Sequence, residues 1–328
     1  MTWLTWRQFR TQALVGLAAL LAVAICTVVI GLRSRDRYEE LRAQFTGGGC
    51  SKILSSLTDD YGLAYDFAGY LLIAVPGIIG LFWGAPLITR ELEAGTHRLV
   101  WNQCMTRTTW LAAKLGLVTL AGMTVTGLYS LLLTWSAGKV DLVADHRFQP
   151  LVFASRNIAP IGYAAFAVVL GTMAGLLLRR TVPAMAVTLV AFAVLQILVP
   201  FVLRPHYASP VTTKVPVTAE MIRNLSMIGR YGKIGGLSVP GGPWVISTST
   251  LLDSDGKEVG HTDWYQNCLN KGLDEIPGCL AAGKLHVQVT EHPADRYWTF
   301  QWYETALFAG LAVLLAGVCF RGIRGPVN

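Results

Sequence analysis

Six apolar runs, each of about 20 residues, constrain this chain more than any other feature of its sequence. They cover residues 13–32, 67–88, 115–137, 158–178, 182–203 and 298–320. The first five contain no Asp, Glu, Lys or Arg, and the sixth contains only Glu304. A helix of about 20 apolar residues crosses the roughly 30 Å hydrocarbon core of a bilayer while satisfying its own backbone groups. The sequence therefore predicts an α-helical integral membrane protein with six transmembrane helices.

The composition argues against a soluble protein. Of the 328 residues, 53% are hydrophobic and only 14% are charged, whereas charged residues make up about 25% of a typical soluble chain. A cleavable signal peptide is the alternative explanation for the first run. That run is longer than the usual apolar region of a signal peptide, and no small-residue cleavage site follows it. We expect it to remain as a membrane span.

Basic residues are distributed unevenly between the segments that connect these runs. Ten Lys or Arg residues and only two Glu residues lie in one set of segments, which comprises 1–12, 89–114, 179–181 and 321–328. The rest of the chain holds 17 basic and 18 acidic residues. Because Lys and Arg in short loops are retained in the cytoplasm, both termini are predicted to be cytoplasmic. Arg33, Arg35 and Arg37 lie on the outer side in this arrangement and violate the rule, although acidic neighbours partly offset their charge.

Outside the spans, the sequence predicts a short interfacial helix and one extracellular domain. The first 12 residues mix aromatic residues with Arg7 and Arg10, which favours an amphipathic helix at the membrane surface over a frayed polar tail. The first external loop is expected to form two short helices separated by a run of three glycines at 47–49. The expected parts are an interfacial amphipathic helix at 1–12, transmembrane helices one to five at 13–203 with a cytoplasmic loop at 89–114, an extracellular domain at 204–297, transmembrane helix six at 298–320 and a cytoplasmic tail at 321–328.

The segment 204–297 is long enough to fold outside the membrane, and its patterns predict a small α+β domain. Leu285, Val287 and Val289 alternate with polar residues, which is typical of a half-buried strand. The sequence DSDG at 253–256 is typical of a turn between the strands of a hairpin.

Three of the six cysteines are expected on the extracellular side. Cys268 and Cys279 flank a loop that contains Gly and Pro within the extracellular domain, so a disulfide between them is expected in an oxidising exterior. Cys50 is then left either free or paired between subunits.

The motifs of enzymes and metal sites are absent from the sequence. It contains no HExxH, paired CxxC, GxSxG or GxxxxGK[ST] motif. Five of the six histidines are expected outside the cell, with no spacing typical of metal ligands. Asp253 and Asp255 are similar to the start of a calcium loop, but Thr262 stands where Glu is required. The chain is therefore predicted to be neither an enzyme nor a metal protein, and no acid-free basic stripe indicates binding of nucleic acid.

Two features within the spans have more than one interpretation. The glycine pairs at 80–84 and 171–175 have GxxxG spacing, which favours close packing of helices over a binding site. Glu304 lies near the start of the sixth span, where a charge marks a functional site by default. It is also shallow enough to reach the interface or to pair with Arg296.

The polar segment between the second and third spans has helix signals at both of its ends. Gly95 and Thr96 can end one helix and begin another, and Thr106 or Thr108 can cap the helix that becomes the third span. A short helix between them, with Trp101 exposed, would present a surface to another protein or to lipid headgroups. A polar turn anchored at the interface is the simpler alternative.

This segment resembles the corresponding loop of ABC-2 type transporter permeases, the transmembrane subunits of type V ABC exporters. The family pattern R-E-x-E-x-G-T…L…[ST]-R…L…K is matched here by Arg90, Glu91, Glu93, Gly95, Thr96, Leu99, Thr106, Arg107, Leu111 and Lys114. The order of parts is similar along almost the whole chain, and the sequences WNQ, TR, HPADRYW and FQW resemble actinobacterial members. Relatives often carry paired cysteines in the first external loop, where this chain has only Cys50.

The resemblance implies that the inner segment docks on a separate ATPase. Residues 91–104 would form the coupling helix, residues 3–12 a connecting helix on the cytoplasmic face, and the substrate path would lie between spans two and five of two permease copies. The implied ATPase-coupling residues are Arg90, Glu91, Glu93, Gly95, Thr96, Arg98, Leu99, Trp101 and Arg107. The implied residues of the substrate path are Phe82, Trp83, Phe192 and Gln196.

The predicted function is the permease subunit of an ATP-driven exporter, working as a homodimer with two ATPase subunits in the bacterial cell membrane. ATP and Mg would bind to the partner ATPase and not to this chain, and lipids would surround the spans. The cargo is expected to be hydrophobic or amphipathic: a drug, a lipid or a peptide. The alternative is a membrane sensor or scaffold that binds an extracellular ligand and signals without transport. A third hypothesis, an ion-coupled carrier, requires buried charges that the first five spans lack.

Overall fold

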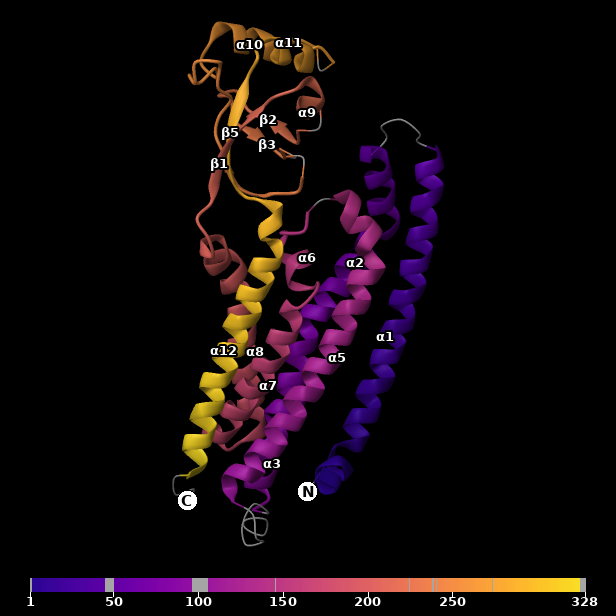
Figure 1. Cartoon of the computed structure of the whole chain (residues 1–328), viewed down its shortest axis with the longest axis vertical. Coiled ribbons are helices and arrows are strands. Elements are labelled where there is room, and N and C mark those ends of the chain that lie inside the picture. Colours follow the sequence, from indigo (N-terminus) through magenta and orange to yellow (C-terminus); the bar gives the residue numbers. More distant parts are fainter. Residues whose placement is uncertain are drawn as a thin grey trace. The chain divides into compact units, whose positions relative to one another are not determined.

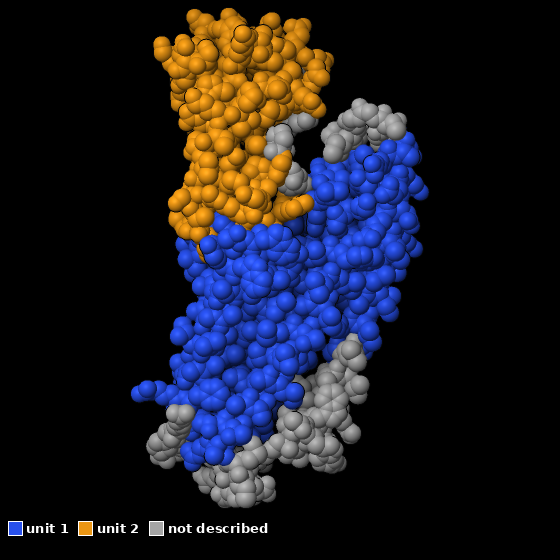
Figure 2. Space-filling view, viewed as in Figure 1, with its two compact units in different colours: residues 1–144, 149–204, 298–328 blue, residues 145–148, 205–297 orange. Residues whose placement is uncertain are grey.

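The computed structural model of the chain describes residues 2–44, 50–95, 106–144, 146–223, 225–237, 239, 241–272 and 274–324. The chain divides into two compact units, which Figure 2 shows in different colours. Unit 1 comprises residues 1–144, 149–204 and 298–328, and unit 2 comprises residues 145–148 and 205–297.

Unit 1 is a bundle of long helices. Within the described part of the chain, six helical segments are long and apolar enough to cross a membrane, as predicted. They are Ala18–Gln44, Ile53–Glu93, Arg107–Ala144, Ala159–Leu178, Thr181–His206 and Ala294–Ile323. The side of the membrane that each end of the bundle faces stays a prediction.

The helical elements follow the chain in a simple order, shown in Figure 1. Two of them, η1 and η2, are short π-helical turns that continue α2 and α8. The elements are α1 (Thr2–Gln44), α2 (Cys50–Ile79), η1 (Gly80–Gly84), α3 (Pro86–Glu93), α5 (Arg107–Ala144), α6 (Pro150–Ala154), α7 (Ala159–Leu178), α8 (Thr181–Leu198), η2 (Val199–Leu203), η3 (Arg204–His206) and α12 (Tyr297–Arg324). In Figure 1, α3 and α6 lie near opposite ends of α7, and we name these the α3 end and the α6 end of the bundle.

The prediction of two separate short helices after the first span is wrong. Instead, α1 continues to Gln44 and α2 begins at Cys50, so the polar residues extend the two spans as regular helices. Contacts between the helices stabilise these extensions: Arg37 Nε donates a hydrogen bond of 3.1 Å to Asp60, and Arg35 donates one of 2.7 Å to the carbonyl of Trp135. Two of the three basic residues that violate the charge rule, Arg35 and Arg37, therefore have partners on neighbouring helices.

The helix α7 forms the centre of unit 1. It contacts α5, α2, η1 and α8, and 72% of its apolar stretch is buried inside the structure. Glycine makes this packing possible: a Cβ added at Gly171 would lie 2.4 Å from the carbonyl oxygen of Gly80, and one added at Gly84 would lie 2.6 Å from that of Val168. The interpretation of both GxxxG pairs as packing faces is confirmed.

Gly171→Ala should therefore weaken the bundle, because the new methyl group would collide with backbone that cannot move independently. We expect a loss of about 2 kcal/mol, the usual cost of overpacking, measured by unfolding in mixed micelles of increasing SDS content. Gly116→Ala is the matched control, since a Cβ at this exposed helical glycine meets nothing within 4 Å. Equal stability of the two variants would contradict this account of the packing.

Unit 2 is a small α+β domain, as predicted. Its main sheet has three antiparallel strands in the order β1 (Val211–Pro216), β5 (His286–His292) and β4 (Trp244–Thr248), and a second sheet pairs β2 (Met227–Ile228) with β3 (Ile234–Gly235). The remaining elements are α9 (Ala219–Arg223), α10 (Asp263–Leu269), α11 (Ile276–Ala282) and η4 (Ala294–Arg296).

Strand β5 confirms the predicted alternation. Val287 and Val289 are fully buried, together with Leu285 just before the strand, and they belong to one apolar cluster. The predicted hairpin is only partly present. The turn forms, because the side chain of Asp253 accepts hydrogen bonds from the backbone nitrogens of Asp255 and Lys257. However, β4 pairs with β5 and not with the residues that follow the turn, since the central strand offers it a longer ladder.

The structure joins Cys268 on α10 to Cys279 on α11 in a disulfide, with 5.7 Å between the Cα atoms. Replacing both cysteines with alanine should destabilise unit 2 by about 2–4 kcal/mol, the usual effect of opening a short loop. Limited proteolysis of the full chain, with fragments identified by mass spectrometry, should show faster cleavage within unit 2. Cys26→Ala, at an exposed free cysteine, is the control and should leave cleavage unchanged. Identical cleavage of the double variant would contradict a stabilising role for the disulfide.

Candidate functional site

Buried and capped polar groups hold the two helices that flank residues 96–105 at the α3 end. Glu91 on α3 forms an ion pair with Lys114 on α5, and Lys114 lies 4.6 Å from the centre of the Trp110 ring. Lys114 is only 7% exposed. A lysine buried to this degree requires a counter-charge, so this pair joins α3 to α5 on both sides of the polar segment.

Glu93 caps the helix that forms the fifth span. Its carboxylate accepts hydrogen bonds from the backbone nitrogen of Thr181 (2.8 Å) and from the Thr181 hydroxyl (2.9 Å). Because Thr181 is the first residue of α8, the negative charge lies at the positive end of that helix. The tight turn that precedes it is made by Arg179, which adopts a left-handed conformation with φ of 52°. The last turn of α3 is thus tied to the start of α8.

The predicted helix signals around the polar segment are confirmed where the structure describes them. Gly95 has a φ of 69° and ends α3, which is typical of a glycine C-cap. Thr106 precedes α5, and its hydroxyl accepts a hydrogen bond of 3.2 Å from the backbone nitrogen of Thr109. The predicted coupling residues Thr96, Arg98, Leu99 and Trp101 lie outside the described residues. Arg90 is exposed on α3, and Arg107 opens α5.

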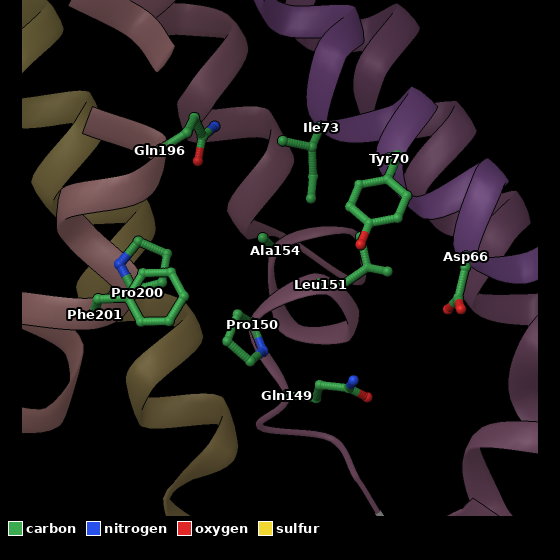
Figure 3. A pocket seen from close by; sticks show the side chains of 10 residues that line it. All are labelled: Asp66, Tyr70, Ile73, Gln149, Pro150, Leu151, Ala154, Gln196, Pro200 and Phe201. Carbon is green, nitrogen blue, oxygen red and sulfur yellow. The ribbon is translucent and has the colours of Figure 1, made fainter. Parts of the chain in front are cut away.

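A cavity of about 390 Å³ lies between α2, α6 and the end of α8, and we name it the α2–α8 cavity (Figure 3). A cavity of this size can hold a drug-sized molecule. Three helical segments contribute its walls, with apolar and polar side chains mixed. The described residues that line it are Asp66, Tyr70, Ile73, Gln149, Pro150, Leu151, Ala154, Gln196, Pro200 and Phe201.

Of the four residues predicted for a substrate path, only Gln196 lines this cavity. Phe192 is 4% exposed and packs so closely on α2 that a Cβ at Gly77 would lie 2.9 Å from its ring. Phe82 is 52% exposed on η1 and does not line the cavity. Trp83 is half-buried beside Gly16 of α1. The spans named for the path do border the cavity, but three of the four named side chains do not.

The short helix α6 was missed by the sequence interpretation, although it forms one wall of the cavity. Gln301 on α12 holds it in place: its Nε2 donates to the carbonyl of Phe153 (3.0 Å), and its Oε1 accepts from the backbone nitrogen of Ala159 (3.0 Å). Arg156 is buried after α6 and pairs with Asp141 of α5 (2.9 Å). A signal was present in the sequence, since Pro150 occupies a first-turn position that favours proline.

A buried ion pair joins the end of the fifth span to the sixth. Arg204 donates two hydrogen bonds of 2.8 Å to the carboxylate of Glu304, and both side chains are 1% exposed. The hydroxyl of Tyr163 also donates to Glu304, and the Arg204 guanidinium lies 4.0 Å from the centre of the Phe153 ring. Pairing with Arg296, one of the alternatives for Glu304, does not occur in the structure, where Glu304 pairs with Arg204. Arg296 instead donates to the carbonyl of Ser209, because η4 places it within unit 2.

Glu304→Gln should destabilise unit 1 by about 3–5 kcal/mol, because it leaves the buried charge of Arg204 without a counter-charge. Unfolding in SDS-containing micelles measures the loss. The double variant Arg204→Met/Glu304→Leu removes both charges and should lose less than the single variant. Glu39→Gln is the control: it breaks the exposed pair with Lys139 (3.3 Å) and should cost no more than about 1 kcal/mol. Similar losses for Glu304→Gln and Glu39→Gln would contradict this role for the buried pair.

Metal-binding chemistry has no support in the described part of the chain. No group of three or more His, Cys, Asp or Glu side chains that could hold a metal ion occurs among the residues searched.

Comparison with known proteins assigns more than half of the chain to one family. The family model described as ABC-2 membrane transporter related matches residues 17–204, which include the cavity and both flanks of the polar segment. No significant match was found among curated proteins or among solved structures.

Proposed function

Because the chain belongs to the ABC-2 membrane transporter related family, we propose that it is the permease subunit of an ATP-driven exporter, energised by a separate ATPase. The six apolar helices make it a multi-pass membrane protein. We place it in a bacterial cell membrane as a homodimer with two ATPase subunits. Its cargo is a hydrophobic or amphipathic molecule, and ATP and Mg bind to the partner.

One observation carries this proposal: both main walls of the α2–α8 cavity are attached to the flank of the polar segment. The wall formed by α2 continues through η1 into α3, with a hydrogen bond of 2.9 Å from the backbone nitrogen of Ala85 to Gly80 across the π-helical turn. The wall formed by α8 begins at Thr181, which Glu93 binds. A partner that moves residues 96–105 therefore pulls on both walls.

The mechanism that follows is a rigid-body change. Binding of ATP would close the ATPase pair and displace the polar segment of each permease copy. Since helices are stiff and Glu91 is paired with Lys114, the displacement would pass into α2, α5 and α8 together. The cavity would then change its access across the membrane. The energy of the change comes from the difference in nucleotide-dependent affinity between the two states.

Changing the polar segment should release the ATPase. In the variant Arg98→Glu/Trp101→Ala, we expect at least a tenfold loss of the P-loop ATPase that copurifies with the tagged chain from native membranes. The loss follows because one charge is reversed and one large contact surface is removed. Quantitative mass spectrometry of the eluate measures it.

Arg321→Glu is the matched control, because it reverses an exposed charge near the end of α12 and should leave the ATPase bound. If the double variant recovers as much ATPase as the unchanged chain, the assignment of the docking site is wrong. Recovery of an ATPase without ATP-dependent movement of any cargo in proteoliposomes would favour the sensor or scaffold in place of the exporter.

A further inference from the structure

Asp66 is an exposed acidic residue on α2 at the α2–α8 cavity. It is the one charged side chain among the ten described residues that line the α2–α8 cavity. Within the described part of the chain it forms no ion pair, whereas Asp60, Asp141 and Glu304 are each paired with an arginine. Its carboxylate is therefore accessible to a ligand that carries a positive charge.

Aromatic rings accompany this carboxylate. Tyr70 follows Asp66 by four residues and Ile73 by seven, so all three lie on one face of α2. Figure 3 shows Tyr70 beside Asp66, with Phe201 on the opposite side of the cavity. The rings of Tyr70 and Phe201 are 64% and 68% exposed. A carboxylate with accessible aromatic faces is a combination that binds organic ammonium groups.

The opposite wall offers a hydrogen-bond donor. Gln196 on α8 lines the cavity, and its Nε2 atom is buried without a hydrogen-bond partner among the described residues. In Figure 3, Gln196 and Asp66 lie on different sides of the cavity, with Leu151 and Ala154 of α6 between them. A ligand that fits this arrangement carries its positive charge at one end, an apolar body, and an acceptor at the other end.

Anions and uncharged lipids fit these walls poorly. Within unit 1, Arg156 and Arg204 lie near lining residues in the sequence, and they are already paired with Asp141 and Glu304. No Lys or Arg occurs among the described lining residues, so no cation there would offset the repulsion between an anion and Asp66. A neutral ligand would gain no charge-assisted contact with that carboxylate.

We propose that the α2–α8 cavity binds amphipathic organic cations, with Asp66 as the residue that selects for positive charge. This assignment rests on the proposed transport function for its biological meaning, since it names the class of cargo. The binding itself needs no ATPase, so the chain alone can test it.

The test compares two dyes with the same aromatic core. Rhodamine 6G is a cation, and rhodamine B is a zwitterion near neutral pH. Fluorescence anisotropy measures their binding to the full chain in phosphatidylcholine nanodiscs, with empty nanodiscs subtracted. We expect Asp66→Asn to raise the Kd of rhodamine 6G about tenfold, the effect of losing one charge-assisted contact, and to change that of rhodamine B less than twofold.

Asp59→Asn is the matched control, because Asp59 is exposed on the same helix two turns earlier and does not line the cavity. It should leave both Kd values within twofold. Gln196→Trp fills the cavity and should weaken both dyes at least tenfold, which locates them there. The proposal is overturned if rhodamine 6G does not bind, if Asp66→Asn and Asp59→Asn act alike, or if Gln196→Trp has no effect.

Failure of this inference and failure of the proposed function have different signatures. If rhodamine 6G is transported in an ATP-dependent way and Asp66→Asn leaves this transport unchanged, the role of Asp66 is contradicted and the exporter function is supported. If cation binding depends on Asp66 but proteoliposomes that contain the ATPase show no ATP-dependent transport, the binding site is supported and the exporter function is contradicted.

Discussion

The close approach of α7 to the turn η1 is the contact on which the rest of unit 1 depends. Helices in a bilayer gain little from the hydrophobic effect against one another, because lipid tails are as apolar as their side chains. Their association therefore depends on van der Waals contact and on polar groups that find partners. Glycines on both helices allow backbone to meet backbone, and this contact positions α2, α5 and α8 around the buried α7.

Polar groups complete the bundle at its two ends. At the α3 end, Glu91 and Glu93 bind Lys114 and Thr181, so one short helix connects the second, third and fifth spans. At the α6 end, Arg204 and Glu304 connect the fifth and sixth spans with two hydrogen bonds in a dry environment. These pairs leave the helices few ways to shift independently. The arrangement suits a protein whose spans move together, as the proposed coupling to an ATPase requires.

The cavity lies where this network leaves a gap. The short helix α6 and the π-helical turn η2 at the end of α8 both contribute residues to its lining. Arg156 and Arg204 near this end are paired across helices, and Asp66 forms no ion pair with the described residues. Because its carboxylate is exposed at the cavity, it is a candidate ligand-binding group.

The sequence by itself determined the features that depend on neighbouring residues. The six spans, the end of α3 at Gly95, the cap at Thr106 and the alternation in β5 follow from hydropathy, backbone freedom and hydrogen bonds within a few residues, and the structure confirms them. The disulfide between Cys268 and Cys279 was also within reach, since only 11 residues separate the two cysteines.

Only the tertiary structure decided which distant residues meet. Glu304 pairs with Arg204, 100 residues away, and Phe192 packs against α2. Gln301 binds α6 through the carbonyl of Phe153, 148 residues away. None of these contacts has a local signature, because each depends on the rotation and depth of helices set by packing elsewhere. For the same physical reason, the sequence named the spans around the cavity but only one of the side chains that line it, Gln196.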